Sequence, residues 1–103
     1  MANVLLGTAN PIYVDATGTL HTGWITIKKI LWVNDETAGD DIAAADFFEL
    51  TDTAGNILVS KCAVVAGDDL HIDFGDDGLP ANGLACTSID GGIAFIYCKP
   101  SAI

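Results

Sequence analysis

The sequence predicts an all-β fold, an antiparallel β-sandwich or jelly roll of seven to eight short strands, in a single domain over residues 1–103. Apolar residues alternate with polar ones in short runs, which is typical of half-buried strands. Turn signals separate the runs about every 8 to 12 residues, the spacing of sandwich proteins. Three Gly-Asp-Asp triplets, which begin at Gly39, Gly67 and Gly75, concentrate charge in those turns. A small closed barrel is the alternative architecture.

The first strands are expected at Asn3–Leu6, at Ile12–Val14 and, as the longest, at Gly23–Val33. The alternation in the longest run slips by one residue at Lys28 and Lys29. A β-bulge at these lysines returns four apolar side chains to one face: Ile25, Ile27, Ile30 and Trp32. Without the bulge a lysine would lie on the core face, which is costly, so we predict the bulge.

The next two strands are predicted at Phe47–Asp52 and Ile57–Ala63, joined as a hairpin by Thr53–Asn56. This connection suits a type I turn with Gly55 in the left-handed region. A further strand is predicted at Leu70–Phe74, where the inward side chains are those of Leu70, Ile72 and Phe74.

A second tight hairpin is expected at Leu84–Ile89 and Ile93–Cys98, across Asp90–Gly92. The run Ile93–Cys98 is apolar on both faces and therefore belongs in the centre of a sheet or at an interface. Evidence for helix is confined to Asp41–Ala45, which could form one capped turn.

The formal net charge is −10, from 14 acidic residues against four lysines, with no arginine. Such a charge repels phosphate backbones and anionic lipids, so we expect neither a nucleic-acid partner nor a membrane partner. No apolar run reaches the roughly 18 residues of a membrane-spanning helix. The segment Met1–Gly7 has no cationic region, so we expect no signal peptide and synthesis in the cytoplasm.

The cysteines and histidines indicate packing and surface roles rather than chemistry. Cys62, Cys86 and Cys98 have no metal-ligand spacing, and we expect unbridged, mostly buried thiols. His21 and His71 are expected on the surface. Of the two tryptophans, we expect Trp32 in the core, and Trp24 partly exposed, where it could contact a sugar or a partner.

One acidic turn resembles the start of a calcium loop. Its residues are Asp73-Phe74-Gly75-Asp76-Asp77-Gly78, but Leu84 stands where a bidentate glutamate would be needed. A solvated turn is therefore the preferred interpretation, with Asp73, Asp76 and Asp77 as weak candidate metal ligands. No nucleophile or phosphate-loop motif occurs, so we expect no enzyme activity, no catalytic residues and no cofactor.

Part of the chain, from Gly23 to Cys98, resembles small structural proteins of tailed bacteriophages. The resemblance is carried by the segments Ile30–Asn34 and Ala38–Asp40, the hairpin Leu50–Ile57 and the apolar strand Gly92–Tyr97. It implies a virion component, either a capsid decoration (cement) protein or a head–tail or tail component. The acidic turn at Asp76 has no counterpart in this pattern.

The resulting functional hypothesis is a capsid decoration subunit, located in the virion, that docks on the major capsid protein or another shell protein and stabilises the shell. High apolar content, with a mean hydropathy of +0.43, favours a homo-oligomer, for which a trimer is the guess by analogy. A cation- or carbohydrate-binding β-module is the alternative outside virion components. A small enzyme, with His71, Asp73 and a cysteine in one pocket, is the third.

Overall fold

The computed structural model describes residues 11–34 and 41–99. These residues form seven strands, and no helix occurs among them. The expected strand at Asn3–Leu6 lies outside the described residues. The strands are β1 (Ile12–Val14), β2 (Gly18–Val33), β3 (Phe47–Thr51), β4 (Ile57–Cys62), β5 (Leu70–Asp73), β6 (Leu79–Ile89) and β7 (Ile93–Cys98).

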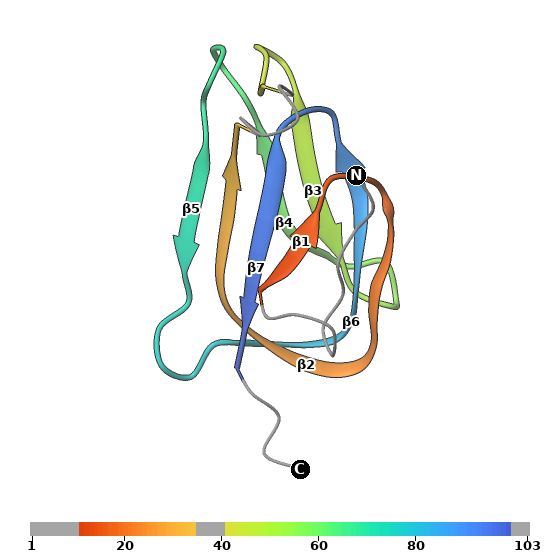
Figure 1. The fold of residues 1–103 in the computed structure, drawn as a ribbon. Coiled ribbons are helices and arrows are strands. Elements are labelled where there is room, and N and C mark those ends of the chain that lie inside the picture. Colours follow the sequence, from red (N-terminus) through yellow and green to blue (C-terminus); the bar gives the residue numbers. More distant parts are fainter. Residues whose placement is uncertain (1–10, 35–40, 100–103) are drawn as a thin grey trace.

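The strands form one antiparallel sheet that folds over on itself, because the long strand β2 takes part in two layers (Figure 1). The first part of β2 pairs with β6, which continues to β3 and then β4. The last part pairs with β5 on one side and with β7 on the other, and β7 continues to β1. The predicted antiparallel sandwich is therefore confirmed. The described strands do not close into a barrel, since β1, β4 and β5 each have one described neighbour.

The predicted bulge in β2 is confirmed, and it lies where the strand passes from one layer to the other. Ile27 is opposite Cys98 and Lys29 is opposite Tyr97, so Lys28 is an extra residue relative to β7. A bulge bends a strand and increases its twist, which suits a corner between two layers. All four side chains assigned to the core face are buried: Ile25, Ile27, Ile30 and Trp32.

The core lies between the two layers and contains a stacked aromatic pair. Trp32 of β2 stacks on Phe48 of β3 with ring centroids 5.4 Å apart. The buried indole Nε1 donates a 2.9 Å hydrogen bond to the Gly91 carbonyl oxygen, so its polar atom is satisfied. Other fully buried large side chains come from both layers and the loop before β3: Ile12, Leu20, Ile27, Ile30, Ile42, Leu50, Leu84 and Ile96.

The hairpin of β3 and β4 forms as predicted. Gly55 has φ of +87°, in the left-handed region that the turn needs. Asp52 holds the turn, since its Oδ1 accepts a 2.8 Å bond from the Asn56 amide. Hydrogen bonds from Asn56 hold the pKa of the exposed Asp52 carboxyl below its usual value.

The predicted hairpin of β6 and β7 is wrong, although both strands exist. β6 pairs with β2 and β3, whereas β7 pairs with β1 and β2. The segment Asp90–Gly92 therefore crosses from one layer to the other. Gly92 permits this crossing: its φ is +74°, and a Cβ there would meet the Val33 carbonyl oxygen and lie 2.7 Å from Ile42 Cγ1.

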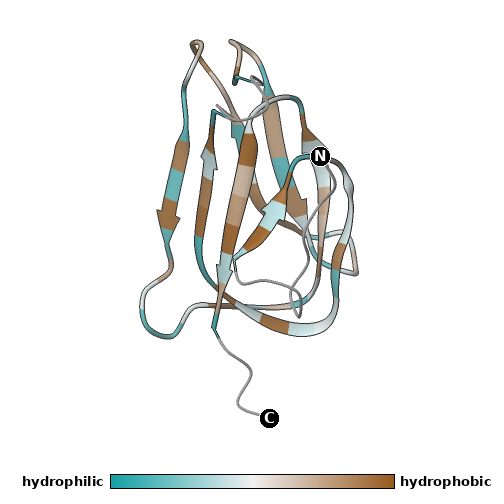
Figure 2. Cartoon of the chain, in the orientation of Figure 1, coloured by the Kyte–Doolittle hydropathy of each residue, from teal (hydrophilic) through white to brown (hydrophobic). Residues whose placement is uncertain are grey.

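The apolar strand β7 is central in its layer, as one of the two interpretations predicted. Its less buried side chains also have neighbours, since Phe95 packs edge-on against Tyr13 and the Lys29 ammonium lies over the Tyr97 ring. In β5 the expected alternation is confirmed, with His71 and Asp73 exposed and Leu70 and Ile72 against the core. The colours along β5 in Figure 2 alternate between hydrophobic and hydrophilic in the same way. The segment Asp41–Ala45 forms a turn and no helix.

Candidate functional site

Two loops meet at one end of the sandwich and expose a cluster of small apolar side chains. One loop precedes β3 and the other follows β4. Val64 and Val65 are 78% and 60% exposed, which is high for branched aliphatic residues. We call this surface the apolar tip, and its exposed residues are Ala43, Ala44, Ala45, Val64, Val65 and Ala66.

Backbone hydrogen bonds join the two loops of the apolar tip. The Ala45 amide donates to the Ala63 carbonyl oxygen, and the Ala63 amide donates to the Asp46 carbonyl oxygen, both at 2.8 Å. The Asp46 carboxylate closes the first loop, because its Oδ2 accepts from the Ala43 amide at 2.8 Å. The Gly67 amide donates to the Ile42 carbonyl oxygen, also at 2.8 Å. The tip is thus a hydrogen-bonded structure and not a pair of independent loops.

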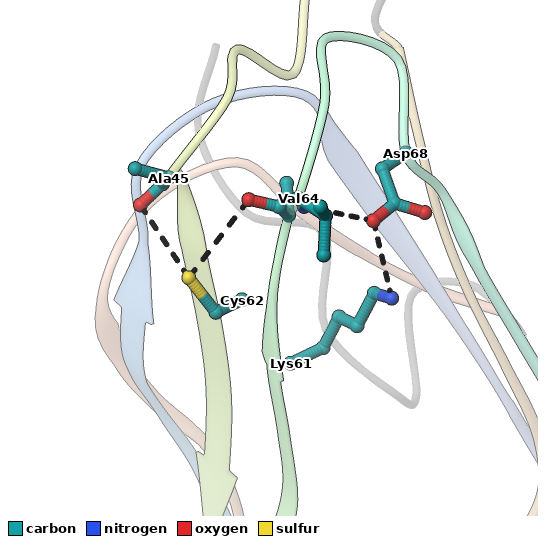
Figure 3. A network of polar contacts seen from close by, with 6 residues as sticks. Ala45, Lys61, Cys62, Val64 and Asp68 are labelled. Atoms are coloured by element: carbon teal, nitrogen blue, oxygen red, sulfur yellow. Dashed lines mark hydrogen bonds and ion pairs between the residues drawn. The ribbon is translucent and has the colours of Figure 1, made fainter.

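Ala45 adopts φ of +71°, the one positive value at a non-glycine among the described residues. Residues with a Cβ rarely occupy this region, and strain of this kind often occurs at functional surfaces. Figure 3 shows Ala45 beside Cys62, whose Sγ lies 3.9 Å from the Ala45 carbonyl oxygen. Cys62 is exposed, so the expectation of a buried thiol is wrong at this position. It stands at the end of β4, a strand at the edge of the described sheet, opposite Phe47.

The second loop of the tip is held by Asp68 (Figure 3). Its Oδ2 accepts from the Val64 amide at 2.9 Å and lies 3.3 Å from Lys61 Nζ. The Val64 hydrogen bond and then Lys61 hold the pKa of the Asp68 carboxyl below its usual value. The carboxylate therefore remains charged at neutral pH and fixes the backbone directly under the exposed Val64 side chain.

A second exposed apolar feature lies on β2. The Trp24 side chain is 72% exposed, whereas Trp32 is fully buried, as the sequence predicted for both. Trp24 is the cross-strand partner of Asn82 on β6, and Asn82 is also exposed. The structure thus places a hydrogen-bonding amide beside the indole.

The three candidate metal ligands lie in the turn between β5 and β6. The Asp73 Oδ1 accepts a 2.8 Å bond from the Gly75 amide, and Asp76 is fully exposed with Oδ1 3.9 Å from Lys28 Nζ. Asp77 is exposed as well. Within residues 11–34 and 41–99, no group of three or more His, Cys, Asp or Glu side chains is arranged to hold a metal ion.

The remaining candidate groups are dispersed. His71 is exposed as predicted, and its Nε2 lies 3.1 Å from Asp69 Oδ2. His21 is half-buried. Cys86 and Cys98 are buried thiols, and burial raises the pKa of each to about 11.

The apolar tip is the feature that sequence reasoning missed. The predicted strand ended at Ala63, and the residues Val64-Val65-Ala66 that follow it were assigned no role. The sequence did contain an indication that these residues leave the strand, since no polar residue alternates with the two valines. Across the described part of the chain, no helix is long and apolar enough to span a membrane.

Comparison of this sequence with protein-family models, with curated proteins and with solved structures gives no match in any of the three. The resemblance to phage structural proteins consequently stays a prediction. A functional proposal for this chain therefore depends on the geometry of its exposed surfaces.

Proposed function

We propose that this chain is a structural subunit that docks on a larger protein shell, with capsid decoration as the specific form of that role. The observation that carries the proposal is the apolar tip, in which Val64 and Val65 are exposed on hydrogen-bonded loops. The resemblance of Gly23–Cys98 to phage structural proteins supports the same class of role. A head–tail or tail component is the alternative position in a virion.

Docking through the tip would bury apolar surface at small entropic cost. Fully burying a valine side chain contributes about 1.5 to 3 kcal/mol relative to leaving it exposed. A surface whose loops are already ordered loses less conformational freedom on binding than a mobile one. Hydrogen bonds of Asp46 and Asp68 to the loop amides provide that order before any partner is present.

Charge indicates the chemistry of the partner. The acidic residues in or next to the two tip loops include Asp41, Asp46, Asp68 and Asp69, and the neighbouring Lys61 is already paired with Asp68. A partner patch that combines an apolar recess with lysine or arginine at its rim is complementary to this surface. Rim charges of this kind affect the association rate and its dependence on salt.

A homo-oligomer remains part of the proposal, with the trimer resting on analogy. The two-sided apolar character of β7 is accounted for within one chain, by its place between β1 and β2. An oligomer therefore has to use other surfaces, of which the apolar tip is one. Light scattering distinguishes a trimer from a monomer of 10.7 kDa.

The test is sedimentation of the protein with particles prepared from its native source. Wild type should co-sediment with a shell, and replacing Val64 and Val65 by serine should weaken binding at least about tenfold. Ile57→Ser is the matched control, since Ile57 is 62% exposed at the opposite end of β4 and should bind like wild type. A wild-type monomer that never co-sediments with a particle would refute the proposal.

A further inference from the structure

The exposed indole of Trp24 is the starting point of an inference that does not depend on shell docking. Its side chain is 72% exposed on the first part of β2, in a chain that buries its other tryptophan completely. Isolated exposed apolar residues are common, but tryptophan is the largest of them and presents a flat aromatic surface. The neighbours of the indole decide what could use that face.

Those neighbours are polar or small. Asn82 is directly opposite Trp24 across the β2–β6 pair, which places the two Cβ atoms about 5 Å apart on one face. Thr26 lies two residues further along β2 and therefore on the same face, opposite the exposed Pro80. This surface joins an apolar plane to an amide and a hydroxyl, whereas the apolar tip presents only alanine and valine side chains.

The backbone under this surface is held in place. The Asn82 carbonyl oxygen accepts a 2.9 Å bond from the Thr53 amide, so the β3–β4 turn supports β6 from the side. The next residue, Gly83, has φ of +87°, and a Cβ there would collide with the Thr53 side chain. The close contact and the hydrogen bond hold the β6 backbone at Asn82 and Gly83 in place before any ligand binds, which lowers the ordering cost of binding.

We propose that Trp24 and Asn82 form a binding site for an uncharged sugar ring. The C–H groups on one face of a pyranose would stack on the indole, while its hydroxyls exchange hydrogen bonds with the Asn82 amide, which both donates and accepts. Charge selects the ligand class, because a protein of net charge −10 repels nucleotides and acidic glycans. The polar flanks of the indole favour a hydroxyl-rich ligand over an apolar protein surface.

The test is tryptophan fluorescence during titration with four neutral oligosaccharides: cellohexaose, maltohexaose, mannohexaose and chitohexaose. Trp32 is buried, so a ligand-dependent change reports on Trp24. We expect at least one of the four to bind with a dissociation constant of about 1 mM, typical of a single stacked ring with few hydrogen bonds. Asn82→Ala should weaken that binding about 3- to 10-fold through the lost hydrogen bonds.

Isothermal titration of the Trp24→Ala variant with the same sugar should show no binding, because the variant has lost the stacking face. Ile57→Ala is the matched control, an exposed apolar side chain on β4, and should bind the sugar like wild type. The site is refuted if none of the four sugars changes the wild-type signal up to tens of millimolar. It is also refuted if Trp24→Ala binds as wild type does. Since no particle is involved, these results are independent of the docking proposal.

Discussion

The two parts of β2 on either side of Lys28 contrast in what surrounds their tryptophans. Residues 18–27 pair with β6 along one side, and residues 29–32 lie between β5 and β7. Trp24 in the first part is 72% exposed, whereas Trp32 in the second part is fully buried and hydrogen-bonded to Gly91. Trp24 and Trp32 are eight positions apart, an even number, so strict alternation would place both side chains on the same face of the strand.

The difference shows that one extra residue changes which side chains of a strand face the core. Lys28 is unmatched in β7, and beyond it the inward positions change from odd to even residue numbers. Ile25 and Ile27 are therefore buried together with Ile30 and Trp32, while Trp24 points away from the core. The same extra residue bends β2 from one layer into the other. The change of inward-facing positions and the bend of the strand therefore have the same cause.

Deleting Lys28 should have the largest effect on this contrast. The deletion removes the extra residue, so Ile30 and Trp32 can no longer share a face with Ile25 and Ile27. We expect loss of cooperative folding, since single domains have only about 5 to 15 kcal/mol of stability. Near-ultraviolet circular dichroism measures the loss of tertiary structure, and thermal melting measures the loss of a cooperative transition.

Substitution at the same position is the control for that deletion. Among the described residues, the Lys28 ammonium donates to the Asp76 carbonyl oxygen at 3.1 Å and lies 3.9 Å from the Asp76 carboxylate, on the surface. Lys28→Ala should therefore change the free energy of unfolding by no more than about 1 kcal/mol. A deletion variant that melts like wild type would show that the bulge is dispensable.

Alanine replacement of each tryptophan tests the comparison directly. Trp32→Ala should lower the free energy of unfolding by about 3 to 5 kcal/mol, because it leaves a cavity against Phe48. Trp24→Ala should change it by about 0.5 kcal/mol or less, as for most surface positions. Urea unfolding measures both, and equal losses would contradict the assignment of one tryptophan to the core and the other to solvent.

Two glycines of similar φ provide a smaller contrast. Gly92 contacts the end of β2, and an added Cβ would meet the Val33 carbonyl oxygen and the Ile42 side chain. Gly55 has open space around the same position and lies in the β3–β4 turn. Gly55→Ala should cost about 1 to 2 kcal/mol from the left-handed backbone alone. Gly92→Ala should cost about 1 to 3 kcal/mol more because of overpacking, again by urea unfolding.

The cysteines give the smallest effect. Cys86 and Cys98 lie opposite Gly18 and Ile27 of β2, and burial raises the pKa of each thiol to about 11. At pH 8 a thiol reagent should thus modify Cys62 quickly and the other two only after denaturation. A raised pKa in the folded state means that stability falls as pH rises from about 9 to about 11. Three equally fast thiols would contradict this burial.

Much of the fold could be predicted because alternation records which face is buried. The slip at Lys28 located the bulge, and Gly55 located the β3–β4 turn. The β6–β7 hairpin was wrong because Asp90–Gly92 signals a tight change of direction and not the identity of the neighbouring strands. The start of β2 was placed at Gly23 instead of Gly18, since two register shifts near His21 interrupt the alternation.

The candidate sites were less predictable, for reasons of distance along the chain. Asn82 and Trp24 become neighbours only through the register of β2 with β6, which a single sequence does not reveal. The apolar tip depends on backbone hydrogen bonds such as that from Ala45 to Ala63. Neither contact depends on the residue types of its own segment. The pattern of apolar and polar residues in the sequence therefore does not reveal either contact.

The pairing order also has a consequence for protein synthesis. Every described neighbour of β1 and β2 is a later strand, and the described neighbour of β1 is β7, the last one. A growing chain therefore holds Ile12 and Val14 without their pairing partners until Ala94 and Ile96 have left the ribosome. Non-local pairing of this kind slows folding and leaves strand edges open to other chains in the meantime. The sheet of this domain can therefore be completed only once β7 has been made, however early β1 and β2 appear.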